Sequence, residues 1–287
     1  MVASTLKDYF SLLKPSVMSL AIFTAFCGFL LAPGKIHFVE AVISLCCVAV
    51  GAGGAGVLNM WYEWDLDAQM SRTKKRPIPR QAIDPKEALA LGLTLSGFSV
   101  VLLGLASNYF AAFLLAFTIF FYGVVYTMCL KPRTPQNIVI GGIAGAFPPV
   151  IGWLIVSSEF SWTPTLMFFL IFFWTPVHFW ALALYQVDEY SKVNIPMLPT
   201  LVGKKKTAEH MFIYAIATVF VSLLLFFMEL FSFFYFLGAL VLGGYLLIKT
   251  WRVWKKDLQE SSKLFVYTIL YLFLLFLLML VDHWLFY

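Results

Sequence analysis

Residues 59–80 are N-M-W-Y-E-W-D-L-D-A-Q-M-S-R-T-K-K-R-P-I-P-R, and they begin where a long apolar segment of the chain ends. Acidic residues come first in this stretch, and basic residues follow them directly. A membrane-spanning helix that ended here would bring both kinds of charge to the point where it meets water. The acidic residues are Glu63, Asp65 and Asp67, and the basic residues are Arg72, Lys74, Lys75, Arg76 and Arg80.

The acidic residues have the spacing of a metal site. On a helix, Asn59, Glu63 and Asp67 lie four residues apart, which stacks one amide and two carboxylates along one face at about 6 Å per step. Like charges so placed repel each other. A hard divalent cation such as Mg²⁺ relieves the repulsion, because it takes oxygen ligands and keeps room for substrate phosphates. The basic residues at 72–80 are then suited to hold the anion that the metal presents.

The loop at residues 62–85 has an alternative interpretation as a solvated cytoplasmic loop whose basic residues only fix the topology. That rule does not require the three acids at the helix end, so these acids favour a functional site. Pro77, Pro79 and Pro85 close the loop. We expect it to be ordered by a ligand that it binds rather than by a core of its own.

Composition predicts an all-α polytopic membrane protein. Of the 287 residues, 61% are hydrophobic and 12% are charged, and the mean hydropathy of +0.87 is too high for a soluble domain of this length. Each crossing of a hydrocarbon core about 30 Å thick needs about 20 residues. We therefore expect one membrane domain over residues 1–287 with nine crossing helices, at approximately 16–33, 39–61, 86–106, 109–130, 137–157, 163–185, 208–229, 231–250 and 264–285.

The basic residues predict the orientation, because short cytoplasmic loops carry the excess of Lys and Arg. With a cytoplasmic N-terminus, 19 of the 20 Lys and Arg residues lie on the cytoplasmic side and only Lys35 lies outside. The net charge of +5 is then explained by topology and anion binding, so no nucleic-acid partner is expected. We expect a multi-pass protein of the cell (inner) membrane, in contact with the lipid bilayer, whose active site is at the cytoplasmic face.

A second set of charged residues is predicted at the same cytoplasmic surface of the membrane. Lys131 and Arg133 follow the fourth crossing, where a phosphate clamp and a pair of topology charges are equally good interpretations. Asp188, Glu189 and Lys192 follow the sixth crossing, much as the first acidic and basic residues follow the second. This layout predicts two four-helix pseudo-repeats plus one further helix. Membrane folds built from repeats tend to place ligands between the halves.

His178 lies within the sixth predicted crossing, about 15 Å deeper than Asp188. An ionisable residue inside a crossing helix indicates a functional site. The alternative is a neutral histidine that is hydrogen-bonded to a neighbouring helix.

Four motifs carry a family resemblance. They are N-x-x-x-E-x-D-x-D-x-x-M-x-R-T-x-x-R-P at 59–77, Y-T-x-x-L-K-x-x-T-P-Q-N at 126–137, G-G-x-A-G-A-x-P-P at 141–149 and D-E-Y-x-x-x-x-I-P-M-L-P at 188–199. Together they resemble the UbiA superfamily of intramembrane prenyltransferases, and M-x-R-T-x-x-R-P and I-P-M-L-P point to its haem branch. The chain departs from the superfamily motif N-D-x-x-D-x-x-x-D because Met60 replaces the first Asp. Where the superfamily often has D-x-x-x-D, this chain offers Gln186, Asp188, Glu189 and Tyr190.

The resemblance implies transfer of a farnesyl group from farnesyl diphosphate to a vinyl group of haem B (protohaem IX), with addition of water, giving haem O and diphosphate. It implies Mg²⁺ or another divalent cation as cofactor, haem B as substrate, and a haem A synthase or terminal oxidase as an assembly partner. The expected metal ligands are Asn59, Glu63, Asp67 and Asp188, with Asp65 and Glu189 as further catalytic residues. Diphosphate is expected at Arg72, Lys74, Arg76, Arg80, Lys131, Arg133 and Lys192, and haem or prenyl contacts at Tyr126, His178, Trp180 and Tyr185.

Two other functions fit parts of the sequence. Prenylation of a quinone precursor by the same fold would use the same charged residues. A cation transporter, a protein of another class, would place carboxylates at the middle of the membrane. The predicted interior is nearly free of carboxylates, which favours the transferase.

Overall fold

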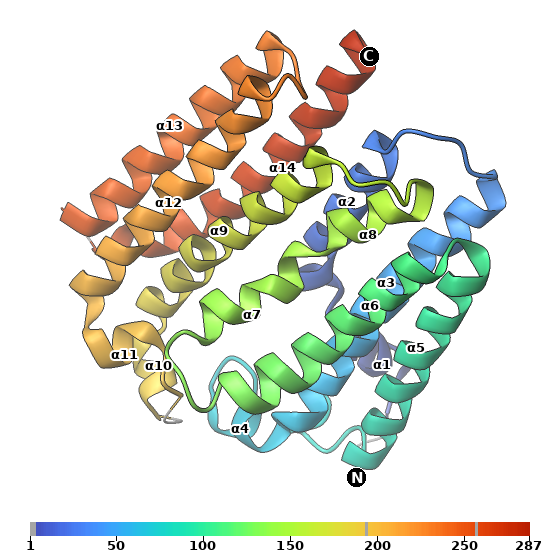
Figure 1. The fold of residues 1–287 in the computed structure, drawn as a ribbon. Helices are drawn as coiled ribbons and strands as arrows, with labels where there is room; N and C mark the ends of the chain where they lie inside the picture. The colour runs from blue at the N-terminus through green and yellow to red at the C-terminus, as the bar shows by residue number, and fades with distance from the viewer. Residues whose placement is uncertain (1–3, 193–194, 256–257) are drawn as a thin grey trace.

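The computed structural model describes residues 4–192, 195–255 and 258–287, and every regular element within them is a helix (Figure 1). The long helices pack side by side, with α4, α10 and α11 at one end of the bundle and the C-terminal end of α14 at the other. The elements are α1 (Leu6–Leu12), α2 (Pro15–Leu31), α3 (Phe38–Tyr62), α4 (Trp64–Gln69), α5 (Pro85–Ala106), α6 (Tyr109–Phe120), the π-helix η1 (Phe121–Leu130), α7 (Asn137–Ala146), α8 (Pro148–Val156), α9 (Trp162–Tyr185), α10 (Val187–Lys192), α11 (Leu198–Val202), α12 (Lys204–Phe227), α13 (Phe233–Lys255), the 3₁₀-helix η2 (Leu258–Glu260) and α14 (Ser261–Phe286).

The predicted crossing segments are present as helices. Within the described residues, eight helical segments are long and apolar enough to cross a membrane, and the α1–α2 pair, bent by 53°, makes a ninth if it counts as one crossing. The first predicted segment, 16–33, corresponds to α2, while α1 in front of it was not predicted. The chain is therefore an all-helical membrane protein.

Polar residues begin several of these helices. Asp84 accepts a hydrogen bond from the Lys86 backbone N–H (2.7 Å) just before α5, and Pro85 occupies the first helical position. Asn108 accepts one from the Ala111 N–H (2.9 Å) at the start of α6. Each cap satisfies a backbone donor that the helix itself leaves free. Only Ser107 and Asn108 lie between α5 and α6, so the cap at Asn108 lets the chain turn back on itself within two residues.

Two predicted crossings are irregular inside. Segment 137–157 is broken at Phe147 into α7 and α8, because neither Pro148 nor Pro149 has a backbone N–H to donate along the helix. The Pro148–Pro149 pair in the sequence predicts a kink at this point, and the structure confirms it. Segment 109–130 changes from the α-helix α6 into the π-helix η1, which the sequence did not predict.

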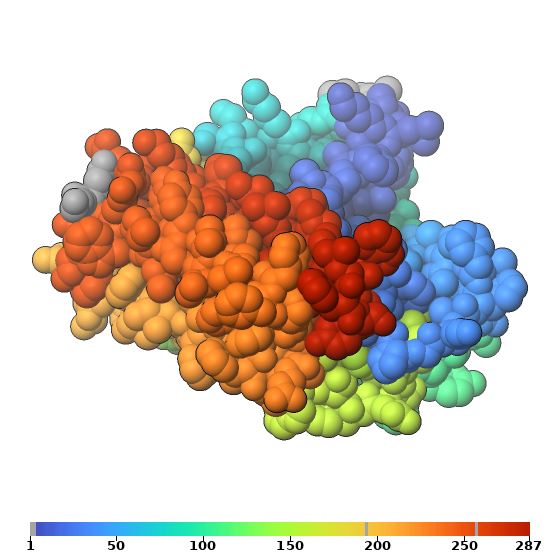
Figure 2. Space-filling model, turned by 90° about the horizontal axis from the view of Figure 1, so that it is seen from above, coloured from blue at the N-terminus to red at the C-terminus, as the bar shows by residue number. Residues whose placement is uncertain are grey.

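Glycines let α2 and α8 approach each other at backbone distance. A Cβ added at Gly28 would lie 2.0 Å from the carbonyl oxygen of Pro149, and one added at Gly152 would lie 1.9 Å from that of Ala25. Small residues at a helix interface in a membrane allow this approach. Seen from above (Figure 2), the C-terminal end of α14 lies between the α12–α13 side of the molecule and the connection from α2 to α3.

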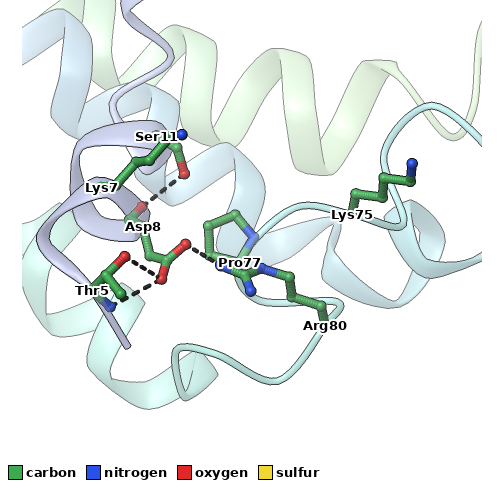
Figure 3. A pocket seen from close by; sticks show the side chains of 7 residues that line it. All are labelled: Thr5, Lys7, Asp8, Ser11, Lys75, Pro77 and Arg80. Carbon is green, nitrogen blue, oxygen red and sulfur yellow. Dashed lines mark hydrogen bonds and ion pairs between the residues drawn. The ribbon is translucent and has the colours of Figure 1, made fainter. Parts of the chain in front are cut away.

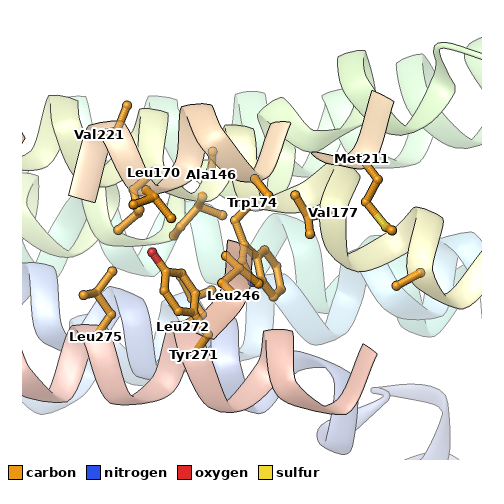
Figure 4. Close-up of a cluster of buried hydrophobic side chains, with 14 of the residues drawn as sticks. Ala146, Leu170, Trp174, Val177, Met211, Val221, Leu246, Tyr271, Leu272 and Leu275 are labelled. Carbon is orange, nitrogen blue, oxygen red and sulfur yellow. The ribbon is translucent and has the colours of Figure 1, made fainter. Parts of the chain in front are cut away.

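The largest apolar core is built around α9, α12 and α14. Figure 4 shows Leu170 and Trp174 of α9 beside Tyr271 and Leu272 of α14, and all four side chains are buried. A smaller cluster joins α3, α6 and α8, and includes Cys47, Leu115 and Ile151. Charged residues lie mostly near the ends of the helices and in the connections rather than within these cores.

The connection from residue 62 to residue 85 has apolar anchors of its own. Ile78 and Ile83 are buried in a cluster with Leu12 of α1 and Val57 of α3, and Met70 is buried against the large core. Our expectation that this loop lacks a core was therefore wrong. The three apolar side chains lie among polar residues in the sequence, so their burial was not evident from periodicity.

Replacing Gly152 by Ala should lower the stability of the protein, because the new Cβ would collide with the Ala25 carbonyl oxygen and force α2 away from α8. Overpacking costs about 1–3 kcal/mol, and a collision with backbone should reach the upper end of that range. The unfolding temperature of the purified variant in detergent measures the effect. Gly97→Ala is the matched control, since nothing lies within 4 Å of its added Cβ. Equal unfolding temperatures for Gly152→Ala and the wild type would contradict the close approach of α2 and α8.

Candidate active site

A row of polar side chains lies where α3 ends. Helix α3 stops at Tyr62, yet the Glu63 N–H still donates to the Asn59 carbonyl (3.1 Å) and the Asp67 N–H to the Glu63 carbonyl (2.7 Å). The spacing of four residues therefore continues through the break into α4. Asn59, Glu63 and Asp67 are 3%, 8% and 3% exposed, whereas Asp65 is exposed to solvent. The predicted common face is confirmed, and Asp65 lies off it.

Each member of this row is bonded to one basic side chain from another part of the chain. A buried carboxylate is costly unless a positive group neutralises it. The pairs of Lys131 and Arg76 supply that charge to the two carboxylates, and all three pairs tie the start of α2, the loop after α4 and the end of η1 to the end of α3. The pairs are Lys14 Nζ with Asn59 Oδ1 (2.5 Å), Lys131 Nζ with Glu63 Oε1 (2.5 Å) and an Arg76 guanidinium nitrogen with Asp67 Oδ2 (2.6 Å).

The π-helix η1 brings its residue Thr127 and the residue after it, Lys131, to this row. Lys131 directly follows it and donates its backbone N–H to the Tyr126 carbonyl (2.9 Å), five residues earlier. Thr127 Oγ1 donates to the Tyr122 carbonyl (2.8 Å) and accepts from Asn59 Nδ2 (3.0 Å). Wide turns of this kind often occur at functional sites. Burial by itself lowers the pKa of Lys131, but the Glu63 carboxylate outweighs burial and raises it above the ordinary value.

Two tyrosines of η1, Tyr122 and Tyr126, lie next to the polar row. The rings of Tyr122 and Tyr126 are stacked, with centroids 5.5 Å apart and planes 21° apart. Tyr126 also lies directly over Gly141 of α7, since a Cβ at that glycine would come within 2.2 Å of the ring. The glycine therefore leaves room for an aromatic face next to the polar row.

The second acidic motif is tied to the first by its glutamate. Glu189 of α10 accepts hydrogen bonds from the Ser71 N–H (2.9 Å) and hydroxyl (2.8 Å) and from Lys192 Nζ (2.7 Å). The Lys192 ammonium and the Ser71 donors lower the pKa of Glu189 to about 2. Asp188 is exposed. The glutamate thus joins α10 to the loop that follows Asp67.

Several basic residues that were predicted to bind diphosphate lie away from the polar row. Arg80 pairs with Asp8 of α1, and Arg133 donates to the Met128 and Cys129 carbonyls at the end of η1. Arg72 and Lys74 are exposed on the loop, and Lys192 is engaged with Glu189. Of the predicted set, the structure brings Arg76 and Lys131 to the row.

His178 occupies an aromatic slot between α9 and α14. Its ring is stacked between Trp174 and Phe265, with both centroid distances 4.5 Å. Its Nδ1 lies 2.8 Å from Thr268 Oγ1, and this hydroxyl donates its own proton to the Phe265 carbonyl (2.6 Å). The hydroxyl must therefore accept from Nδ1–H, which leaves a lone pair on Nε2. Of the other predicted contacts, Trp180 is buried against Tyr214 of α12 and Tyr185 is exposed.

Lys14 belongs to the site but was not predicted. It was counted only as a topology charge before the first crossing. A lysine directly before a proline at the start of a predicted crossing was the available signal. The sequence could not show that this lysine turns inward to Asn59, 45 residues later.

The donor atoms suit a hard divalent cation. The row offers buried carboxylate and amide oxygens, which are the ligands that Mg²⁺ takes in proteins. Among the described residues, no group of three or more His, Cys, Asp or Glu side chains lies close enough together to hold a metal ion. Basic nitrogens neutralise these oxygens instead. A metal at this row therefore requires that the basic side chains release their partners.

Comparison with known proteins identifies relatives over nearly the whole chain. The sequence model of the UbiA prenyltransferase family matches residues 21–286. A protoheme IX farnesyltransferase of Rhizobium leguminosarum bv. trifolii (strain WSM2304) is 54% identical over 282 residues, which cover 96% of this chain and 89% of the relative. A protoheme IX farnesyltransferase of Agrobacterium fabrum (strain C58 / ATCC 33970) is 52% identical with the same coverage.

Solved structures share the fold. A structure of digeranylgeranylglyceryl phosphate synthase matches with a TM-score of 0.81 at 17% identity, covering 96% of this chain and 98% of the other. A UbiA homolog from Archaeoglobus fulgidus, bound to GPP and Mg²⁺, matches with a TM-score of 0.68 at 15% identity, covering 94% and 99%. At these identities the similarity concerns the arrangement of helices.

Replacing Lys131 by Met should destabilise the metal-free protein, because Glu63 would keep a buried charge without its partner. Breaking a buried pair in this way costs about 3–5 kcal/mol. Unfolding in detergent with a chelator present measures the loss. Adding Glu63→Gln to this variant removes the orphaned charge and should restore most of the stability. If Lys131→Met alone is as stable as the wild type, leaving the Glu63 carboxylate without its partner costs no stability.

Proposed function

The chain belongs to the UbiA prenyltransferase family, and we propose that it transfers a farnesyl group from farnesyl diphosphate to a vinyl group of protohaem IX (haem B), with addition of water, giving haem O and diphosphate. Relatives more than 50% identical over nearly the whole chain carry the name protoheme IX farnesyltransferase. The observation that carries the chemistry is the buried row Asn59, Glu63 and Asp67 with a basic side chain on each member.

In the membrane, the proposed topology has nine crossings, a cytoplasmic N-terminus and one domain over residues 1–287. The clustering of basic residues on one side supports it, as does the bent α1–α2 pair, which supplies a ninth crossing. One of those basic residues, Lys256, lies outside the described residues. With this topology, the protein lies in the cell (inner) membrane, and the site at the C-terminal end of α3 is at its cytoplasmic face. A haem A synthase or terminal oxidase as assembly partner stays a prediction.

The polar row holds the diphosphate end of the substrate. Asn59, Glu63 and Asp67 supply oxygens to a divalent cation, with Asp188 as a further candidate ligand from the second motif. When bound, the cation offsets negative charge on the departing diphosphate. The basic side chains bind the oxygens of that diphosphate by charge-assisted hydrogen bonds. These side chains are Lys14, Arg76 and Lys131, with Arg72 and Lys74 on the exposed loop as predicted additional contacts.

Loss of diphosphate leaves an allylic cation at C1 of the farnesyl group. The stacked faces of Tyr122 and Tyr126 lie beside the polar row and can stabilise a cation by cation–π attraction while they exclude water. The vinyl carbon of haem B attacks C1, and water then adds to the carbocation that forms next to the porphyrin. No protein nucleophile is needed in this sequence of steps.

The acceptor binds deeper in the membrane, where His178 contacts the haem. The aromatic slot of Trp174 and Phe265 fixes the ring, and the hydrogen bond to Thr268 leaves Nε2 available to iron. A neutral imidazole with one nitrogen held by a neighbour is the usual form of a haem ligand. Trp180 and Tyr185 stay predicted contacts that no observation of their surroundings supports.

The family assignment makes the chain a prenyltransferase, so the cation transporter is no longer an alternative. The quinone precursor remains one. Purified protein with farnesyl diphosphate and Mg²⁺ should convert haem B into haem O, identified by mass, and should leave 4-hydroxybenzoate unchanged. Prenylation of the aromatic acid without any haem O would support the quinone alternative instead.

Asp67→Asn should lower turnover by about 100-fold or more, because it removes one charge from the metal-binding row while preserving the size of the side chain. Asp65→Asn is the matched control, since Asp65 is exposed and lies off the row. Haem O formation across a Mg²⁺ titration measures both variants. If Asp67→Asn is as active as Asp65→Asn at every Mg²⁺ concentration, Asp67 is not a metal ligand.

His178→Ala should weaken haem binding and remove the absorption signature of imidazole-bound haem, while the affinity for farnesyl diphosphate stays the same. A haem titration followed by absorption spectroscopy tests this directly. His283→Ala is the control, because His283 lies near the C-terminal end of α14, where its ring stacks on Tyr287 and on none of the predicted haem contacts. An unchanged spectrum and haem affinity in His178→Ala would leave His178 as a packing residue between α9 and α14.

A further inference from the structure

A second polar pocket lies between α1 and the loop after α4, on the other side of that loop from Asp67. It has a volume of about 420 Å³, and Figure 3 shows Lys7, Asp8 and Ser11 of α1 on one side and Lys75 and Arg80 of the loop on the other. Arg80 was predicted to bind the substrate diphosphate. Its guanidinium faces α1 instead, while Arg76 of the same loop faces Asp67.

The charges that line this pocket favour an anion. Its one carboxylate, Asp8, accepts from the Thr5 N–H (3.0 Å), from the Thr5 hydroxyl (2.8 Å) and from Arg80, so its charge is already compensated. The side-chain ammonium groups of Lys7 and Lys75 have no hydrogen bond or ion pair to any described residue. Arg80 uses one of five N–H donors on Asp8. Two free ammonium groups and several guanidinium donors thus surround one empty space.

The three faces of α1 indicate the depth at which this pocket lies in the membrane. Leu12 is fully buried on the inner face, and Lys7 and Ser11 lie one turn apart on the pocket face. On the remaining face, Leu6 and Phe10 are 89% and 61% exposed. α1 is bent by 53° away from α2, and an exposed apolar face beside a lysine is typical of a helical segment that lies along the membrane surface while α2 makes the crossing. The pocket is then level with the phospholipid headgroups.

We propose that this pocket binds the phosphate group of an anionic phospholipid, with Lys7, Lys75 and Arg80 as its donors. The exposed side chains of Leu6 and Phe10 lie against the acyl chains beside it. Polybasic segments next to a membrane attract anionic lipids in this way. The bound lipid links α1 to the loop that carries Arg76, so it stabilises the entrance of the diphosphate site without taking part in the reaction.

The test measures the unfolding temperature of the full chain in neutral detergent after addition of phosphatidylglycerol, phosphatidylcholine or inorganic phosphate. Phosphatidylglycerol should raise it, and the other two should not. Lys7→Gln/Lys75→Gln should lose most of that rise. Neither lysine side chain has a partner among the residues that the structure describes, so the variant should keep the stability of the lipid-free wild type. The matched control is Lys204→Gln/Lys205→Gln, which removes the same charge from an exposed site at the start of α12.

Each other result overturns the proposal. An equal rise with phosphatidylcholine would mean that the headgroup charge is not recognised. An equal rise with inorganic phosphate would assign the pocket to a free anion rather than to a lipid. Equal losses in the two double variants would mean that the lipid responds only to overall surface charge. Native mass spectrometry of wild-type protein with phosphatidylglycerol should also find one tightly bound lipid that Lys7→Gln/Lys75→Gln lacks.

Discussion

Buried negative charge at the C-terminal end of α3 is the constraint on which the rest of the structure depends. A carboxylate withdrawn from water needs a positive partner, and here every partner comes from a different part of the chain. The end of η1, the loop after α4 and the start of α2 are therefore all drawn to the same place. The charge pairs are Lys131 with Glu63 and Arg76 with Asp67, and Lys14 reaches the same row through a hydrogen bond to the amide of Asn59.

The proposed reaction uses the same charges in a second arrangement. A divalent cation can replace basic nitrogens on the carboxylates, and a diphosphate can take those nitrogens as its own donors. Both ions would thus enter a site where Lys131 and Arg76 already balance Glu63 and Asp67, so neither carboxylate is left buried alone. Metal and diphosphate should for this reason bind together more readily than either binds alone.

Periodicity predicted what depends on local geometry. The four-residue spacing gave the buried face of Asn59, Glu63 and Asp67, and the paired prolines gave the break between α7 and α8. The partner toward which a side chain points across the fold could not be predicted from the sequence. Arg76 and Arg80 are four residues apart in one loop, yet one faces Asp67 and the other faces Asp8, because the loop has turns and apolar anchors between helices. Lys14 and the Thr268 partner of His178 depend on contacts 45 and 90 residues apart.

The most direct measurement is an experimental structure with Mg²⁺ and a non-hydrolysable analogue of farnesyl diphosphate. Our prediction is that the oxygens of Asn59, Glu63 and Asp67 coordinate the metal, while the nitrogens of Lys14, Arg76 and Lys131 lie within hydrogen-bond distance of the diphosphate oxygens. A bound analogue with all three original pairs intact would contradict it, because the row would then be a structural clamp beside the site rather than the site itself.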